Sequence, residues 1–235
     1  EGWELISGEL REGHSSVVTV SGTQTEVGES SNYFSVVIVD ERGADVSGHY
    51  EIEYQPGTLR VTPRAVSVTA GRAARAYDGT ALTCESFSVT GGQLAQGHSI
   101  SASFGASVTQ VGKVQNKMAV AVFDAEKKDV TANYAVTVTD GLLEVTPRKL
   151  VLQSASDSKV YDGTPFTLEK YEVNEGSLAD GQSEKVTFNA SLTGVGSVQN
   201  AFAAVIYASD GVTDVTSNYD LSCLFGTLEI TKRPL

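Results

Sequence analysis

One phrase occurs three times in this chain of 235 residues, at intervals of 84 or 85 residues. It reads Asp-Val-(Thr/Ser)-x-(Asn/His)-Tyr, and seven residues after the Tyr comes Gly-x-Leu-x-(Val/Ile)-Thr-x-Arg. The copies span 45–50 with 57–64, 129–134 with 141–148, and 214–219 with 226–233. A repeat of this length is typical of one folded unit used several times. Enzymes are seldom built from near-identical tandem copies, so the repeat favours a stalk or scaffold.

The spacing of the copies predicts three domains, at residues 1–64, 65–148 and 149–235. The first is expected to lack the opening segment of a full copy, because Trp3 aligns with Phe87 and Tyr171. In an alternative frame, each domain starts near Leu5 or its equivalent and ends near Asp78, and the last domain is then the incomplete one. A full copy of this size is long enough for a compact β-domain.

Apolar residues alternate with other residues throughout each copy. The clearest runs are 18–20 and 34–38, 102–104 and 118–122, and 186–188 and 202–206. Alternation with frequent Val and Thr, broken by Gly and Asn, is typical of half-buried antiparallel strands. No apolar stripe has the period of a helix, so we expect the chain to be all-β.

Six or seven short strands in a copy of this length favour a sandwich of two sheets. Tyr50, Tyr134 and Tyr219 are expected to begin the penultimate strand, which would form a hairpin with the last strand. This position resembles the tyrosine corner of immunoglobulin-like folds, in which the hydroxyl bonds to nearby backbone. We therefore expect tandem immunoglobulin-like antiparallel β-sandwich domains. A β-grasp-like fold is the alternative, weakened by the absence of a helical pattern.

The predicted domains follow one another almost without a linker. The last strand of one copy leads through Thr-Pro63-Arg or Thr-Pro147-Arg directly into the first strand of the next. Proline fixes its own φ and favours an extended residue before it, and neither link contains glycine. Such junctions predict a stiff rod in which neighbouring repeats are each other's main partners.

Charge and composition exclude several classes of partner. The net charge is −12, with 11 acidic and 4 basic residues in 1–64, 7 and 7 in 65–148, and 11 and 6 in 149–235. Nucleic acids and anionic membranes require clustered Lys and Arg, and no apolar run is long enough to insert into a membrane. The two cysteines, Cys84 and Cys223, align with Leu168 and with Tyr54 and Val138, so we expect no disulfide.

A second recurring phrase is Tyr77-Asp78-Gly79-Thr in the second copy and Tyr161-Asp162-Gly163-Thr in the third. Together with the Asn-Tyr and Gly-x-Leu-x-Ile-Thr phrases, it resembles the YDG- and MBG-type repeats of bacterial surface proteins. That resemblance covers the chain apart from the missing start of the first copy. It implies extracellular structural modules on a bacterial cell surface or cell wall, and it brings no catalytic or binding residues with it.

The Tyr-Asp-Gly phrase is best explained as a turn, with Asp accepting local backbone bonds and Gly supplying a positive φ. Asp78 and Asp162 are weaker candidates for a Ca²⁺ site near the domain junctions. Calcium needs six or more oxygen ligands, and no Asp-x-Asp-x-Asp loop supplies them. We therefore expect no cofactor, with Ca²⁺ as the less favoured alternative.

The other recurring residues are best explained as structural. Asp45, Asp129 and Asp214 are expected to cap the loop before the corner Tyr. Trp3, Phe87 and Tyr171 are expected to lie in the core, although a sugar-binding platform is an alternative. The three histidines are scattered, and no recurring catalytic triad, carboxylate pair or phosphate-binding loop is present. Asn32, Asn116 and Asn200 recur in register, but without a lysine that could form an isopeptide bond with them.

These observations predict a monomeric, non-enzymatic stalk of a bacterial surface adhesin that presents a distal binding region. A module that binds a host glycan, mucin or protein is the first alternative. It predicts one copy with an exposed aromatic cluster that its sister copies lack. An ancillary module of a secreted glycosidase is the second alternative.

Overall fold

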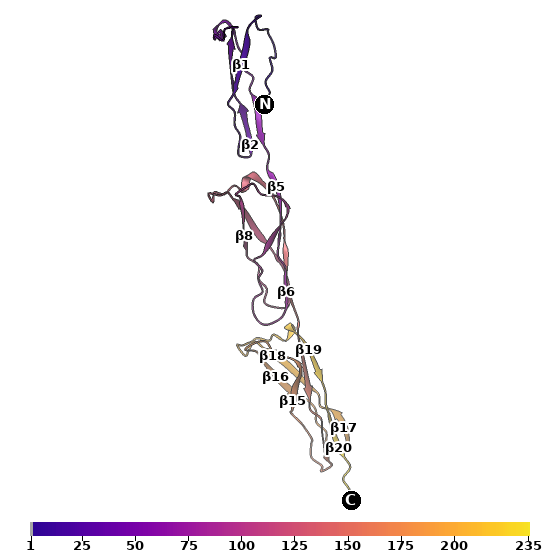
Figure 1. Ribbon diagram of the computed structural model, residues 1–235. Coiled ribbons are helices and arrows are strands. Elements are labelled where there is room, and N and C mark those ends of the chain that lie inside the picture. The colour runs from indigo at the N-terminus through magenta and orange to yellow at the C-terminus, as the bar shows by residue number, and fades with distance from the viewer. Residues whose placement is uncertain (1) are drawn as a thin grey trace. The chain divides into compact units, whose positions relative to one another are not determined.

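The computed structural model describes residues 2–235, and the described chain is all-β (Figure 1). Small mixed and antiparallel sheets recur along it, and its only helical elements are three single turns of 3₁₀-helix. This arrangement indicates repeated small β-domains. No helix within these residues is long and apolar enough to cross a membrane.

The chain divides into two compact units. One contains Glu1–Val66, Gly91–Ile100 and Ala121–Thr137, and the other contains Ser67–Thr90, Ser101–Val120 and Val138–Leu235. The division passes through the strands of residues 65–148. The domain boundaries at 64/65 and 148/149 therefore stay a prediction, and "repeat 1", "repeat 2" and "repeat 3" denote residues 1–64, 65–148 and 149–235 below.

Repeat 3 shows the strand pairing most fully. Strand β13 (Arg148–Ser154) lies between β15 (Tyr171–Gly176), to which it is antiparallel, and β19 (Tyr219–Leu224), to which it is parallel. Strand β14 (Asp157–Val160) runs parallel to β20 (Thr227–Thr231), which pairs on its other edge with the antiparallel β17 (Gly196–Gln199). Strands β16 (Ser183–Phe188) and β18 (Phe202–Tyr207) form an antiparallel pair.

The expected hairpin between the last two strands is wrong. Strands β19 and β20 belong to different sheets, and each pairs instead with a strand from the start of the repeat. The opening segment breaks after β13 and resumes as β14, so it supplies one strand to each sheet. The last two strands follow it in parallel and are separated for that reason.

Repeat 2 has the same elements in the same order. Its sheets have the orders β11-β5-β7, β6-β12-β9 and β10-β8. The strands are β5 (Arg64–Ala70), β6 (Ala73–Ala76), β7 (Phe87–Gly92), β8 (Ser99–Phe104), β9 (Gly112–Asn116), β10 (Met118–Phe123), β11 (Tyr134–Thr139) and β12 (Gly141–Thr146).

Residues 2–63 form four strands, in two antiparallel pairs. Strand β1 (Ser15–Val20) pairs with β3 (Phe34–Val39), and β2 (Gly28–Asn32) pairs with β4 (Gly57–Val61). No strand is formed by residues 3–8 or 50–54, whose counterparts in repeat 3 are β15 and most of β19. In repeat 3 both of these strands pair with β13.

Alternating side chains from the central strands form the cores. Leu150 and Leu152 of β13 are fully buried with Ile206 of β18, and Val66 of β5 is buried with Val122 and Tyr134. Val66, Val122 and Ile206 are buried in strands whose side chains alternate in burial, whereas Leu150, Val151 and Leu152 form a continuous buried run. The sequence alternation therefore identified strands such as β3, β10 and β18 correctly, whereas the strand expected to begin at Tyr50 is not formed.

The aromatic series at the start of each copy is not in the core, contrary to expectation. Trp3 is 51% exposed, and Phe87 and Tyr171 are each 37% exposed. Strand β15 lies at the edge of its sheet, so Tyr171 packs on Phe188 and Phe202 with one side only, at centroid distances of 6.4 Å. Its hydroxyl group donates a 3.1 Å hydrogen bond to the Glu184 carboxylate.

Asn116 and Asn200 are fully buried and hold the break in the opening segment. Asn116 Nδ2 donates to the carbonyls of Gly71 and Cys84, at 3.0 and 2.9 Å, and Asn200 Nδ2 donates to those of Ala155 and Leu168, at 3.0 Å each. Buried carbonyl groups without a donor destabilise a fold. The recurrence of Asn in this register is thus explained by backbone bonding.

We predict that Asn200→Ala lowers the free energy of unfolding by about 1–3 kcal/mol, because it leaves two buried carbonyl groups without a donor. Urea denaturation of the whole chain would measure the change. Asn174→Ala is the matched control, since Asn174 is exposed on β15, and it should shift stability by less than about 0.5 kcal/mol. Equal effects of the two substitutions would contradict this role of Asn200.

Candidate functional site

The phrase that defines the repeat folds into the same loop three times. In each copy the Asp side chain accepts the backbone N–H of the residue two positions later, Ser47, Thr131 or Thr216, at 2.8–2.9 Å. A single 3₁₀ turn follows, formed by η1 (Ser47–His49), η2 (Thr131–Asn133) and η3 (Thr216–Asn218). The aspartate thus fixes the start of the turn, which is a local bonding pattern common for this residue.

The Ser or Thr of the phrase ties this loop to the core. Its hydroxyl oxygen accepts the backbone N–H of Ile38, Val122 or Ile206, at 2.8 Å in every copy. These three residues are buried in the strand that precedes the loop. Hydrogen bonds from the Thr131 side chain and backbone also lower the pKa of the Asp129 carboxyl group. Hydrogen bonds from Ser47 and Thr216 lower the pKa of Asp45 and of Asp214 in the same way.

The Tyr of the phrase anchors a second, distant loop. Its hydroxyl accepts the backbone N–H of Arg11, Ala95 or Ala179, at 3.2, 2.9 and 2.8 Å, which lies 39 or 40 residues earlier in the chain. The same hydroxyl bonds the side chain of His14, His98 or Gln182 at 2.6–2.8 Å. The expected bond to nearby backbone is therefore wrong. The ring packs inward as expected, since Tyr134 and Tyr219 are buried.

The Asn of the phrase bonds to the preceding repeat. Asn133 Oδ1 accepts the N–H of Val27 at 2.8 Å, and Asn218 Oδ1 accepts the N–H of Val111 at 2.8 Å. The Asn Nδ2 donates to the side chain just before that valine, Glu26 or Gln110. Each of these bond pairs lies inside one compact unit. The two junctions thus share one hydrogen-bonding pattern, formed by equivalent residues.

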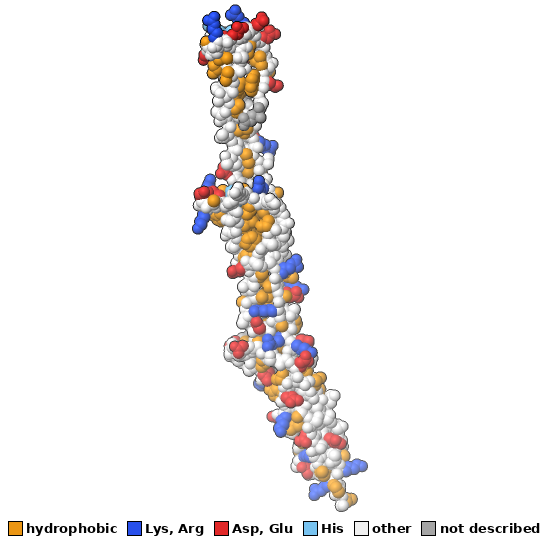
Figure 2. Space-filling model, viewed as in Figure 1, with side chains coloured by type: hydrophobic (Ala, Val, Ile, Leu, Met, Phe, Trp, Pro, Cys, Tyr) orange, Lys and Arg blue, Asp and Glu red, His pale blue; other side chains and the backbone are white. Residues whose placement is uncertain are grey.

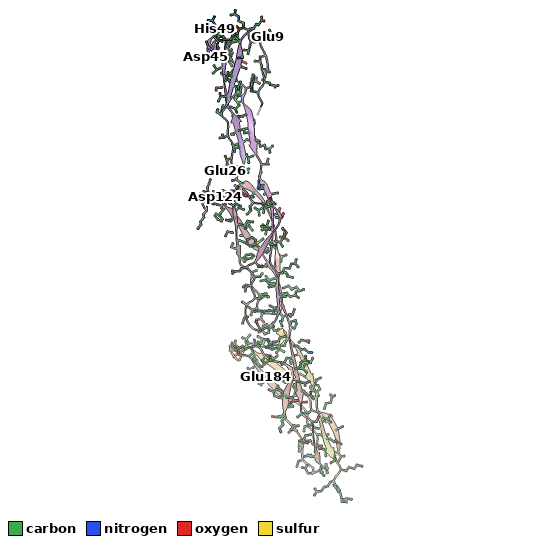
Figure 3. All side chains as sticks on the ribbon, in the orientation of Figure 1. Glu9, Glu26, Asp45, His49, Asp124 and Glu184 are labelled. Carbon is green, nitrogen blue, oxygen red and sulfur yellow. The ribbon has the colours of Figure 1, made fainter. Side chains whose placement is uncertain are left out.

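The first junction also has an ion pair. Lys128 Nζ lies 3.7 Å from a Glu26 carboxylate oxygen, and Figure 3 shows Glu26 beside the loop that begins at Asp124. Both side chains are more than half exposed, so this pair contributes little to stability.

The second junction shares an apolar core. Tyr77 and Val145 of repeat 2 are buried in the same cluster as Leu150, Ala179 and Tyr219 of repeat 3. The rings of Tyr77 and Tyr219 meet edge to face, with centroids 5.7 Å apart. Gln182 Nε2 donates to the Tyr77 hydroxyl at 2.9 Å while its Oε1 accepts from Tyr219. Repeats 2 and 3 are therefore joined by buried side chains as well as by Asn218.

Short links that contain proline connect the repeats at these junctions. Pro147 alone separates β12 from β13, and two residues that include Pro63 separate β4 from β5. The arginine after each proline, which is the last residue of its repeat, bonds to the repeat that follows. The Arg64 guanidinium donates to the carbonyl of Leu94, at 3.2 Å, and Arg148 Nε donates to that of Ser177, at 2.6 Å.

The Tyr-Asp-Gly phrase forms a turn in both copies. Asp78 Oδ1 accepts the N–H of Thr80 at 2.9 Å, and Asp162 Oδ1 accepts that of Thr164 at 2.9 Å. Gly79 and Gly163 have φ of +82° and +80°, in the left-handed region that glycine adopts without strain. Bonds from Thr80 lower the pKa of Asp78, while a bond from Lys159, followed by those from Thr164, lowers that of Asp162.

Both aspartates already have a cationic partner. Arg75 Nη1 lies 3.0 Å from Asp78 Oδ2, and Lys159 Nζ lies 2.9 Å from Asp162 Oδ1. Across residues 2–235, no three His, Cys, Asp or Glu side chains are close enough together to hold a metal ion.

Cys84 and Cys223 are free thiols. A shallow cleft of about 300 Å³ at the second junction is lined by polar side chains that include Asp78, Gln110 and Asp180.

The sequence indicated the junction segments but not the residues that join them. Asn133, Asn218, Val27 and Val111 were not candidates, although the Asn-Tyr and Val-Gly pairs both recur in register. Their recurrence was the available signal. It could not be assigned to a junction without knowing that the two loops meet.

No family model and no curated protein matches the chain. A solved structure of an endo-fucoidan hydrolase from glycoside hydrolase family 107 aligns with 97% of this chain at 13% sequence identity, with a TM-score of 0.18. The chain spans 38% of the length of that enzyme.

We predict that the loop aspartates make stability depend on pH. Since their folded pKa is lowered, the ionised carboxylate favours the folded state above the ordinary pKa of about 4, and this contribution is lost as the pH falls through the lowered value. Asp214→Asn should therefore lower the urea midpoint at pH 7 and have a much smaller effect near pH 2.

The matched control is Asp220→Asn, because Asp220 is exposed and receives no side-chain hydrogen bond within the described chain. It should change the urea midpoint little at either pH. If Asp214→Asn lowered the urea midpoint by the same amount at pH 7 and at pH 2, the charge of the Asp214 carboxylate would not be the cause of the lost stability.

Proposed function

We propose that this chain is a structural spacer of a bacterial surface adhesin, in which repeated β-domains stack into a stiff rod that presents a distal binding region. The observation that carries the proposal is the repeated junction. The same Asn accepts the same Val N–H at both junctions, at 2.8 Å each time. A flexible string of domains would not need a conserved bonding pattern between neighbours, whereas a spacer of fixed geometry would.

The short links support the same proposal. A linker of one or two residues that contains proline has few conformations, and the arginine that follows is bonded to the next repeat. The buried Tyr77 and Val145 add apolar area to the second junction. Each of these features restricts motion between adjacent repeats without forming a binding site.

We further propose that each complete repeat is an immunoglobulin-like β-sandwich. The buried Tyr that begins β11 and β19 supports it. A β-grasp-like fold is the alternative, and the parallel pairing of the opening strands with the last strands is compatible with it. Extracellular location on a cell surface or cell wall follows from the sequence resemblance to YDG- and MBG-type repeats.

One observation favours a binding function as the second candidate. Repeat 1 exposes Tyr33, Tyr54 and Trp3, at 62%, 47% and 51%, and the residues at the first two positions in the sister repeats are not aromatic. Aromatic rings with one free face bind sugars and proteins. Glycan-array binding by the wild-type chain, lost in Tyr33→Ala, would favour a glycan-binding adhesin module over a spacer.

The test of the spacer is small-angle scattering of the chain with Asn133→Ala and Asn218→Ala combined. We expect wild type to have a maximum dimension of about 100 Å, from three strand-length units of roughly 33 Å each. The double variant should lose only about 0.5–1.5 kcal/mol per bond, yet should show a smaller radius of gyration because its junctions bend more.

Asn174→Ala with Asn189→Ala is the matched control, since both side chains are exposed. A compact wild-type particle, or a wild-type maximum dimension that changes greatly when calcium is chelated, would contradict the metal-free rod. Identical scattering of wild type and the junction variant would show that the Asn bonds do not stiffen the chain.

A further inference from the structure

The opening segment of repeat 3, residues 148–160, runs parallel to its closing segment, residues 219–231. Strand β13 pairs with β19, and β14 pairs with β20, with the same offset between partners in both sheets. The register begins with Arg148 opposite Tyr219 and continues to the ends of β14 and β20. The hairpin expected from the sequence would instead have paired the last two strands with each other.

The break between β13 and β14 does not interrupt this contact. Ser154 Oγ accepts the N–H of Gly226 at 2.9 Å, and Ser156 Oγ accepts that of Thr227 at 2.9 Å. A Cβ added at Gly226 would lie 2.5 Å from the Ala155 carbonyl oxygen, so the two backbones approach each other closely here. Side-chain hydrogen bonds thus connect the two segments where the backbone pairing passes from one sheet to the other.

Buried apolar side chains flank the pairing on both segments. Leu150 and Leu152 of the opening segment and Leu228 and Ile230 of the closing segment are at most 1% exposed. Figure 2 shows charged side chains of both signs scattered over the visible surface of repeat 3, so these apolar groups lie inside. A hydrogen bond is stronger in such a low-dielectric interior than in water, so the pairing is costly to break.

Tension along the chain enters this pairing at its two opposite ends. Pro147 leads directly into β13 at Arg148, and β20 ends at Thr231. Because the pairing is parallel, such tension pulls one segment lengthwise past the other and loads all the hydrogen bonds between them together. In an antiparallel hairpin the two pulled ends are adjacent, so its bonds break one after another.

Repeat 2 has the same arrangement. Strand β6 runs parallel to β12, with Leu143 opposite Ala73, and β5 lies beside β11 in the other sheet. A Cβ added at Gly141 would lie 1.9 Å from the Gly71 carbonyl oxygen, so the two backbones also meet at the break. The pairing of opening and closing segments is therefore a property of the repeat and not of one copy.

We propose that the complete repeat is a mechanical clamp, which bears tension along the chain by loading its opening and closing segments in shear. This inference rests on the proposed spacer function for the source of the tension, since a stalk that presents a distal binding region is pulled at both ends. It concerns resistance to unfolding, whereas the scattering experiment measures how freely neighbouring repeats bend. Either proposal can therefore fail while the other holds.

The test is single-molecule force spectroscopy of the whole chain in a Cys84→Ala, Cys223→Ala background, with two pairs of attachment points. Handles on Pro147→Cys and Lys232→Cys load the segments in shear, whereas handles on Pro147→Cys and Ser217→Cys peel β13 from β19. All three attachment positions are exposed. Unfolding of repeat 3 in shear should release roughly 250–300 Å of chain. At equal loading rate, we expect its unfolding force to be at least about twofold higher in shear than in peeling.

The matched variants are Ser156→Ala and Ser158→Ala, at two exposed serines of the opening segment. Of the two hydroxyl groups, only that of Ser156 has a hydrogen bond within residues 2–235, and its partner is the closing segment. At a fixed shear force, Ser156→Ala should unfold about two- to tenfold faster than wild type, as expected for one hydrogen bond, and Ser158→Ala should unfold at the wild-type rate.

Equal unfolding forces in the two pulling geometries, or equal unfolding rates of the two serine variants, would overturn the clamp. A higher force in shear, found in a chain that scattering shows to bend freely, would support the clamp and contradict the spacer.

Discussion

The loop that contains Asp-Val-(Thr/Ser)-x-(Asn/His)-Tyr is the constraint on which the rest of the fold depends. Its Asp starts the 3₁₀ turn, its Ser or Thr hydroxyl accepts an N–H from a buried strand, and its Tyr hydroxyl bonds a loop about 40 residues earlier. These three bonds fix the direction in which the Asn points, which is toward the preceding repeat. A local turn motif thereby determines the contact between neighbouring domains.

The two junctions share this Asn but differ in the rest of their contacts. The second buries Tyr77 of the Tyr-Asp-Gly turn against Tyr219, with Gln182 bridging the two hydroxyls. The first junction has an ion pair between Glu26 and Lys128. The position of Asn133 and Asn218 is occupied in repeat 1 by His49, which lies with Asp45 in the same loop in Figure 3. The Asn bond is therefore the contact that both junctions share.

Much of the strand content was predictable because a period of two in Val, Leu and Ile is a local signal. The buried face of β18, with Phe202 and Ile206, follows from that alternation directly. The pairing was not predictable in the same way. Whether β20 pairs with β19 or with β14 depends on the break at Ala155, and the alternation is the same in both cases.

In the candidate site, too, local features were predictable from the sequence and long-range contacts were not. The turn at Asp78-Gly79 was recognisable, because its bonds lie within three residues. The bond from Val111 to Asn218 spans 107 residues, so the sequence gives no spacing rule for it. The exposure of Phe87 and Tyr171 was missed because an aromatic residue in an alternating strand looks the same at a sheet edge as in a core. Edge position is a property of the topology.

The central claim is that Asn of the repeated loop fixes each repeat to the one before it, and hydrogen exchange of three equivalent amides tests it most directly. Val27 and Val111 each donate their N–H to such an Asn, whereas the N–H of Val195 has no acceptor within residues 2–235. Residue-resolved exchange should find the Val27 and Val111 amides at least about tenfold more protected than that of Val195. Equal exchange rates at all three valines would contradict the account.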